Sequence, residues 1–303
     1  MKTKTKVGTV EFSCPVLPAS GCFGYGIELA QYYDMSALGG IVTKAVTMDE
    51  RPGNGMPRIA ETPSGLLNAI GLENPGVEFF LDVLLAQIKR FQLPIIVNLA
   101  GKKLKDYVSL AEKMLDPQIA ALELNLSCPN VKTGCMSIGT NAREIKRLVS
   151  AVRKVTDKAI WVKLTPNVTD ITEMAKAAES AGADAVSLIN TLVGMTIDLE
   201  ARKPVLKNNT GGLSGPAIMP VALRMVSECY RAIEIPIVGM GGIATAEDAL
   251  AFLMAGASAI QVGSSTLVDP DLLFSLGDKM AHRASELGFS SLSEVCGSLE
   301  YWD

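Results

Sequence analysis

Short runs of apolar and β-branched residues recur along the chain, and helical patterns of apolar positions fill the gaps between them. The short runs have the length of buried strands, and the longer stretches have the period of amphipathic helices. Eight strands are predicted at 15–20, 40–46, 94–100, 121–127, 159–165, 185–191, 236–242 and 259–265. Helices are predicted, among other places, at 76–91, 141–155, 170–182 and 245–257.

This alternation of strand and helix predicts an α/β fold, a (β/α)8 TIM barrel formed as one domain by residues 1–303. A doubly wound open sheet is the alternative, and it would place a Gly-x-Gly-x-x-Gly turn after the first strand. The stretch GCFGYG at 21–26 instead spaces its glycines as Gly-x-x-Gly-x-Gly. The barrel is therefore favoured.

The predicted strands all end in polar residues or glycines. In a TIM barrel, functional groups gather at the carboxyl ends of the strands. Packing alone does not account for eight such ends, so we interpret them as a ligand site. The residues are Ser20, Lys44, Asn98, Asn125 with Ser127, Lys163, Asn190 with Thr191, Gly241 with Gly242, and Gly263 with Ser264.

The chemistry of these strand ends favours a flavin over a sugar phosphate. The two glycine-containing ends, at 241–242 and 263–264, let backbone N–H groups approach a phosphate. The amide side chains suit a flat polar ring, and Lys44 and Lys163 supply positive charge that favours the reduced ring. We therefore predict FMN at the C-terminal face of the strands.

The strand at 121–127 alternates strictly, with leucine at 122, 124 and 126 and polar residues at 123, 125 and 127. We expect the leucines to pack outward against helices, and Asn125 and Ser127 to face the barrel mouth. The strand ends at Cys128, which is followed by a polar, glycine-containing loop. Such a loop above a barrel mouth is typical of a lid.

Composition and charge exclude several classes of function. The net charge of -4, with no basic block, disfavours a nucleic-acid partner. No apolar run reaches the roughly 18–20 residues that span a bilayer, so no membrane association is expected. The first residues, MKTKTKVGTVEF, lack the apolar core of a signal peptide, which predicts a cytoplasmic protein.

Six cysteines and one histidine limit the metal and acid–base chemistry. No C-x-x-C pair occurs, so zinc and iron–sulfur ligand sets are disfavoured and no metal site is predicted. The thiols are expected to be free. His282 lies in a charged helical stretch, so we expect an acid–base step to use another residue.

Five motifs stand out at or beyond the strand ends. They are NLSCPN at 125–130, WVKLTPNVTDI at 161–171, NTLVGMTIDLEARKPVLKNNTGGLSGPA at 190–217, PIVGMGGI and AIQVGSS. Together they resemble the dihydroorotate dehydrogenases over essentially the whole chain, and most closely class 1B, the catalytic subunit of the NAD-dependent enzymes. The resemblance implies FMN-dependent oxidation of dihydroorotate to orotate, the redox step of pyrimidine biosynthesis.

Position by position, the resemblance assigns Cys128 as the catalytic base. It implies FMN contacts at Ser20, Lys44, Ala45, Asn98, Asn125, Lys163, Ile189, Gly215, Gly241, Gly242, Gly263 and Ser264. It implies substrate contacts at Lys44, Asn68, Ala69, Ile70, Gly71, Leu72, Asn125, Asn190 and Thr191. The loop at 134–139 departs from the class 1B pattern and carries a second thiol, Cys135; we prefer Cys128 because it lies at a strand tip.

The resemblance also implies protein partners. Nothing in the sequence indicates a site for NAD, FAD or an iron–sulfur cluster. The resemblance to class 1B implies a separate subunit with FAD and a 2Fe-2S cluster, which would pass electrons to NAD. A homodimer of this chain within a heterotetramer is the expected assembly.

Several alternatives remain open from the sequence. The nearest is a class 1A enzyme, which passes electrons to fumarate without a partner subunit, and a relative that reduces pyrimidines is another. A different class is a flavin-free phosphate-binding barrel, either an isomerase or a Schiff-base aldolase that uses Lys163 as its amine. A non-catalytic FMN-binding module is the last.

Overall fold

Eight parallel strands form the central sheet, in the order β3-β16-β15-β10-β9-β8-β7-β4. The computed structural model describes residues 1–126 and 138–302. The two edge strands approach each other where the Gly39 N–H donates to the Val16 carbonyl at 2.9 Å, so the sheet nearly closes. The strands are β3 (Val16–Pro18), β4 (Ile41–Val42), β7 (Ile95–Leu99), β8 (Ile119–Asn125), β9 (Ala159–Lys163), β10 (Ala185–Leu188), β15 (Ile237–Met240) and β16 (Ala257–Val262).

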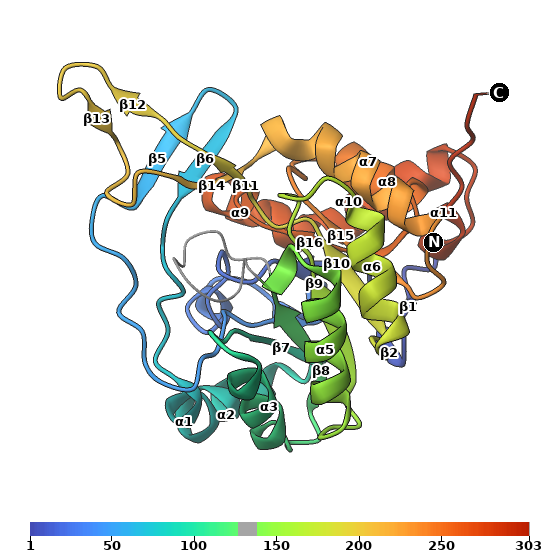
Figure 1. Cartoon of the computed structure of the whole chain (residues 1–303). Coiled ribbons are helices and arrows are strands. Elements are labelled where there is room, and N and C mark those ends of the chain that lie inside the picture. Colours follow the sequence, from blue (N-terminus) through green and yellow to red (C-terminus); the bar gives the residue numbers. More distant parts are fainter. Residues whose placement is uncertain (127–137, 303) are drawn as a thin grey trace.

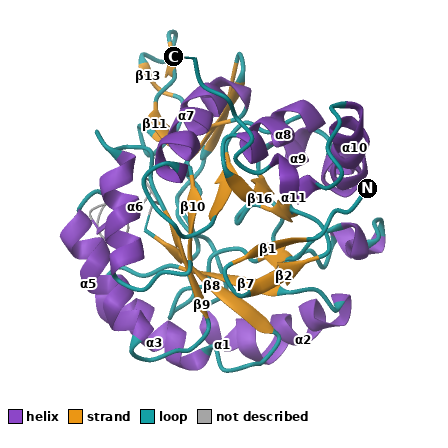
Figure 2. Cartoon of the chain, turned by 90° about the vertical axis from the view of Figure 1, so that its right-hand side faces the viewer, coloured by secondary structure: helices purple, strands orange, loops and turns teal. Residues whose placement is uncertain are grey.

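Each barrel strand overlaps its predicted range, and helices surround the sheet (Figure 2), so the (β/α)8 TIM barrel is confirmed. Side-chain caps set several helix starts; Asp170, for example, accepts the N–H of Thr172. The helices are α1 (Val77–Phe79), α2 (Leu85–Ile88), α3 (Leu104–Lys113), α5 (Ala142–Arg153), α6 (Ile171–Ser180), α7 (Met219–Tyr230), α8 (Ala246–Met254), α9 (Ser265–Val268), α10 (Pro270–Glu286) and α11 (Leu292–Val295).

Among the described connections between barrel strands, one lacks a regular α-helix and another has an interrupted helix. The connection after β3 begins with three glycines of positive φ, at 21, 24 and 26. Its only helical turns are 3-10 turns at Leu29–Gln31 and Met35–Ala37. The helix predicted at 76–91 is divided by a π-helical turn at Phe80–Leu84, where the Leu85 N–H donates to the Phe80 carbonyl. Neither departure changes the order of the barrel strands.

Alternate residues of the barrel strands form layers inside the barrel. The lowest layer, toward the amino ends, is apolar. Two residues further along the strands, the inward positions are polar and buried. The apolar layer holds Leu17, Val42, Ile96, Ala121, Ala159, Trp161, Ala185, Val238 and Ala259; the polar layer holds Asn98, Glu123, Lys163, Ser187 and Gln261.

An N-terminal hairpin, β1 (Thr5–Val7) and β2 (Val10–Phe12), packs on the apolar layer. Phe12 is 2% exposed, and its ring meets that of Trp161 edge-on, with centroids 6.1 Å apart. The hairpin therefore closes the amino end of the barrel, which leaves the carboxyl end for a ligand.

Replacing Phe12 with alanine is expected to lower the free energy of unfolding by about 3–5 kcal/mol, because a buried ring is lost from the core. Urea unfolding followed by circular dichroism measures this loss. Phe79→Ala is the matched control, since Phe79 is 48% exposed. Equal and small losses in both variants would show that the hairpin is not part of the core.

A second, antiparallel sheet lies beyond the carboxyl ends, in the order β11-β14-β6-β5. It brings Asn68 opposite Gly212, although these residues are far apart in sequence. This sheet and the β12–β13 ribbon project from the barrel at the upper left of Figure 1. The strands are β5 (Ile59–Thr62), β6 (Gly65–Asn68), β11 (Leu192–Gly194), β12 (Ile197–Asp198), β13 (Lys203–Pro204) and β14 (Gly211–Ser214).

Within the described ranges, no helix is long and apolar enough to cross a membrane.

Candidate functional site

A cavity of about 380 Å³ opens at the carboxyl ends of the barrel strands. Small-molecule sites are commonly clefts of roughly 300–1,000 Å³ with a few convergent polar groups. Most of the residues predicted for the site line this one cavity, although they come from distant parts of the chain. They are Ser20, Lys44, Ala45, Asn68, Ile70, Gly71, Leu72, Asn125, Lys163, Ile189, Asn190, Thr191, Gly241, Gly242, Gly263 and Ser264.

Three predicted residues lie next to the cavity rather than on its wall. Asn98 is fully buried, and its Oδ1 accepts the Asn125 amide at 3.2 Å. Ala69 packs in a small cluster around Leu67 and Leu206. Gly215 packs closely against the glycine pair that follows β15: a Cβ on Gly242 would lie 2.8 Å from the Gly215 carbonyl oxygen.

The predicted base, Cys128, lies outside the described residues, as do Ser127 and Cys135. The described chain stops at Leu126, one residue after Asn125, whose side chain lines the cavity. The leucines at 122, 124 and 126 belong to the core cluster, as their spacing predicts.

Lys163 is the buried cation of the site. It is 3% exposed, and its Nζ donates to Ser20 Oγ at 3.2 Å. Its nearest carboxylate oxygen, on Glu123, lies 4.0 Å away. Because Lys163 lines the cavity with its ammonium group near the first strand end, it can place positive charge beside a bound ligand.

Glu123 and Gln261 were missed as site residues. The fully buried Glu123 carboxylate accepts hydrogen bonds from Asn98, Ser187 and Gln261. The strand alternation places Glu123 on the same face as Asn125, which was the available signal. Gln261 likewise precedes Gly263 by two positions and lines the cavity. The hydrogen bond between them could not be predicted from the sequence, because it joins β8 to β16 across the barrel.

Cys22 also lines the cavity and had no predicted role. Burial raises the pKa of its thiol above the usual value, and the nearby charge of Lys163 acts in the opposite direction. The protonated thiol is therefore the form expected at neutral pH, so Cys22 contributes packing and not a second base. Its position two residues beyond Ser20 was the signal that could have found it.

The two positions that follow β15, 241 and 242, require glycine. Gly241 and Gly242 have φ angles of 130° and 82°, which other residues rarely adopt. A Cβ on Gly241 would also lie 2.8 Å from that of Ala222. The chain therefore keeps bare backbone at the cavity wall, as a close approach to an anion requires.

The segment after β6 is fixed against the strand ends. Gly71 and Leu72 both have positive φ angles, 81° and 60°, and turn the chain over the cavity. Leu72 packs against Ala45 and Ala100. Asn54 Nδ2 donates to the Ala69 carbonyl at 2.8 Å, which holds the segment from outside. Ala69 is buried in the cluster around Leu67 and Leu206, whereas Asn68 and Ile70 line the cavity.

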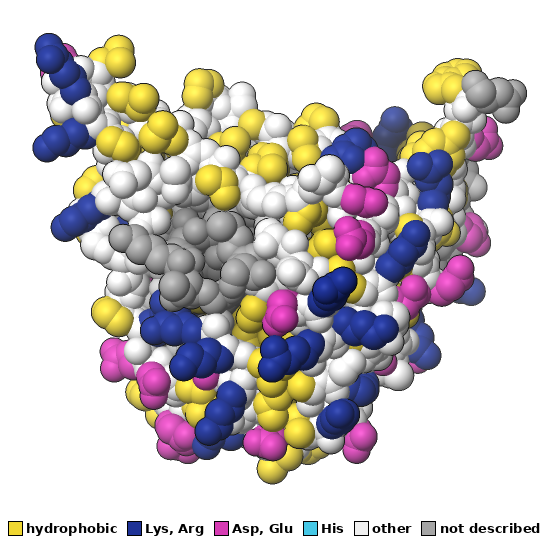
Figure 3. All heavy atoms as spheres, viewed as in Figure 1, with side chains coloured by type: hydrophobic (Ala, Val, Ile, Leu, Met, Phe, Trp, Pro, Cys, Tyr) yellow, Lys and Arg dark blue, Asp and Glu magenta, His cyan; other side chains and the backbone are white. Residues whose placement is uncertain are grey.

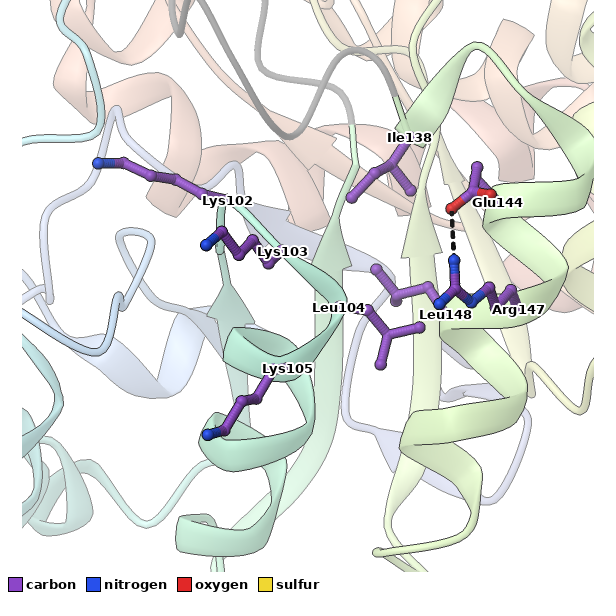
Figure 4. A pocket seen from close by; sticks show the side chains of 8 residues that line it. All are labelled: Lys102, Lys103, Leu104, Lys105, Ile138, Glu144, Arg147 and Leu148. Atoms are coloured by element: carbon purple, nitrogen blue, oxygen red, sulfur yellow. Dashed lines mark ion pairs between the residues drawn. The ribbon is translucent and has the colours of Figure 1, made fainter.

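A second hollow, of about 430 Å³, lies between α3 and α5. Its floor contains Leu104 and Leu148, and its lysines at 102, 103 and 105 extend to one side (Figure 4). Arg147 is 3.7 Å from Glu144 and is already paired. The polar groups do not converge, so the cavity at the strand ends is the better ligand site.

His282 lies on α10, away from this cavity. Its side chain is 80% exposed and 3.3 Å from Glu286. It takes no part in the cavity, as the sequence predicts.

The fold and the site define a TIM-barrel protein with a polar small-molecule site at the carboxyl ends of its strands. The sequence profile of the family described as Dihydroorotate dehydrogenase matches residues 2–283. The chain therefore belongs to the dihydroorotate dehydrogenase family, a family of oxidoreductases.

Three of its relatives are named "Dihydroorotate dehydrogenase B (NAD(+)), catalytic subunit". They come from Bacillus cytotoxicus, Bacillus cereus and Bacillus anthracis. Each is 52% identical to this chain over 284 residues, which covers 93% of this chain and 92% of the relative. The resemblance to class 1B is confirmed.

Proposed function

We propose that this chain uses FMN to oxidise (S)-dihydroorotate to orotate in pyrimidine biosynthesis, and that the electrons pass to NAD through a partner subunit. The observation that carries the proposal is the single cavity at the strand ends. It gathers almost every residue that the family resemblance assigns to FMN or substrate. The names of the relatives support the reaction and the acceptor.

The cavity fits FMN by the chemistry of its walls. The bare backbone at Gly241 and Gly242, with Gly263 and Ser264 beside it, suits a phosphate. The Lys163 ammonium and the amides of the polar layer suit the ring. The Oε1 atom of Gln261 is buried and has no hydrogen-bond partner among residues 1–126 and 138–302, as expected where a ligand supplies the donor. When bound, FMN supplies a hydride acceptor.

The substrate would lie between the barrel mouth and the segment after β6. Amide side chains at 68, 125 and 190, with Thr191, line this side of the cavity and can pair with a pyrimidine ring and its carboxylate. Lys44 adds a cation from the end of β4, and residues 69–72 shape the wall. These groups would bind and orient the substrate.

Cys128 is the proposed base that takes the C5 proton of dihydroorotate. It follows Asn125, the last residue of β8 and part of the cavity wall, by three positions in the sequence. An unperturbed thiol has a pKa of about 8.5, so only a minority is thiolate at neutral pH.

The proposed assembly is a homodimer of this chain in a heterotetramer with subunits that carry FAD and a 2Fe-2S cluster. The words "catalytic subunit" in the relatives' names support a separate partner. Apolar side chains are exposed on the second sheet and the β12–β13 ribbon (Figure 3), as is usual at protein interfaces. They are Ile59, Val193, Met195, Ile197 and Leu199. We also propose a cytoplasmic location and a single domain spanning residues 1–303.

The purified protein is expected to be yellow and to bleach when dihydroorotate is added without oxygen. Absorption spectra and release of the flavin by denaturation measure both properties. A colourless protein that binds no added FMN would overturn the proposal in favour of a flavin-free barrel. A yellow protein that dihydroorotate does not bleach would keep the flavin and reject the substrate.

A further inference from the structure

We propose that Glu123 is a positioning residue of the flavin site: its carboxylate fixes the direction of the amides beside the ligand and balances the charge of Lys163. The inference rests on the proposed FMN site and deepens it. Glu123 does not line the cavity, so it would act only through the residues that it holds.

The first observation is the number and direction of the contacts that Glu123 makes. Its Oε1 accepts the Asn98 amide at 2.6 Å, and its Oε2 accepts Ser187 Oγ and Gln261 Nε2, both at 2.8 Å. These donors come from β7, β10 and β16, so one fully buried side chain joins strands across the barrel. Such a carboxylate is held in place from several sides.

The second observation is the direction of the amides. An ionised carboxylate can only accept hydrogen bonds, so each amide that contacts it must present its NH₂ group. Asn98 therefore turns its Oδ1 toward the Asn125 amide, 3.2 Å away. Gln261 turns its Oε1 away from Glu123, and this atom has no partner within the described ranges. Glu123 thus determines which faces of the amides are acceptors.

This arrangement selects the chemistry of the ligand. Gln261 lines the cavity and is fully buried, so an unpaired acceptor on it costs free energy until a ligand donates to it. The N–H group of a planar imide is a suitable donor, and flavins carry one. A glutamine in place of Glu123 would let Gln261 reverse its amide and present a donor instead.

The third observation is electrostatic. Lys163 and Glu123 form a buried pair, with 4.0 Å between Nζ and Oε1. The carboxylate offsets part of the ammonium charge that a ring above Lys163 would experience. Removing the negative charge should therefore stabilise the reduced, more negative flavin relative to the oxidised form.

The test compares Glu123→Gln with wild type in FMN binding and in reduction potential. We expect the ratio of the dissociation constants of oxidised and reduced FMN to rise at least tenfold, which corresponds to about 30 mV for a two-electron couple. Titration of the apoprotein with FMN and equilibration with redox dyes measure the two quantities. A ratio within twofold of wild type would overturn the inference.

Ser187→Ala is the matched control. It removes one hydrogen bond from the same carboxylate and leaves the charge, so it should lower Tm without a tenfold change in the ratio. An equal change of this ratio in Glu123→Gln and Ser187→Ala would show that Glu123 has a structural role only. If Glu123→Gln does not fold, Gln261→Leu decides: tenfold weaker binding of oxidised FMN supports the inference, and unchanged binding overturns it.

Failure of the inference is distinct from failure of the proposed function. Wild-type protein that binds no FMN would overturn both. Wild-type protein that binds FMN, with variants that behave alike, would overturn only the role of Glu123.

Discussion

Cys128→Ala is expected to lose most of its turnover with dihydroorotate while it keeps its FMN. General-base catalysis typically contributes about 10²–10⁴ in rate, and alanine cannot accept the C5 proton. FMN should stay bound because most of its proposed contacts belong to other strand ends that line the same cavity. Anaerobic stopped-flow bleaching of the bound flavin measures the step directly.

The pH dependence of this step follows from the state of the thiol. In the proposed mechanism the thiolate of Cys128 is the base, so the bleaching rate should rise with pH until the thiol is fully ionised. With an ordinary cysteine pKa of about 8.5, the rise continues into the alkaline range. Cys128→Ser should also be slow, because a hydroxyl is a weaker base unless a neighbouring group activates it.

Cys135→Ala is the matched control, since it removes the other thiol that the sequence places near Cys128 along the chain. It is expected to bleach at nearly the wild-type rate. Near-normal turnover of Cys128→Ala, with loss in Cys135→Ala, would transfer the role of base to Cys135.

Local pattern was sufficient to predict the barrel and much of its site. A strand buried on both sides keeps a two-residue period, so the sequence around 121–127 indicates which residues face inward. The end of each strand then marks the ligand face. For this reason Lys44, Asn125 and Lys163 could be assigned to the same end of the barrel before any contact was known.

Contacts between distant segments could not be predicted in this way. The sheet that joins β6 to β14 depends on pairing between residues 68 and 212, and neither segment has a strong strand pattern. The partnership of Glu123 with Gln261 depends on the width of the barrel, which a linear pattern does not contain. The roles assigned to Ala69 and Gly215 came from resemblance alone, and neither residue lines the cavity.

Lys163→Ala is expected to weaken FMN binding or to slow reduction of the flavin by dihydroorotate. The variant removes the buried cation of the cavity and leaves the Glu123 carboxylate without its counter-ion. Breaking a buried ion pair by removing one partner typically costs about 3–5 kcal/mol, so the apoprotein should also be less stable. FMN titration, the anaerobic bleaching rate and urea unfolding together measure these effects.

Lys158→Ala is the control that separates the loss of stability from the effect on FMN. Lys158 lies just before β9, five residues from Lys163, and its Nζ donates to the carbonyls of Asp116 and Ile119 at the amino end of the barrel. Its loss should lower stability without changing FMN affinity, because it is far along the strand from the cavity. A Lys163→Ala variant that binds and reduces FMN like wild type would remove this lysine from the flavin site, even if its stability falls as much as that of Lys158→Ala.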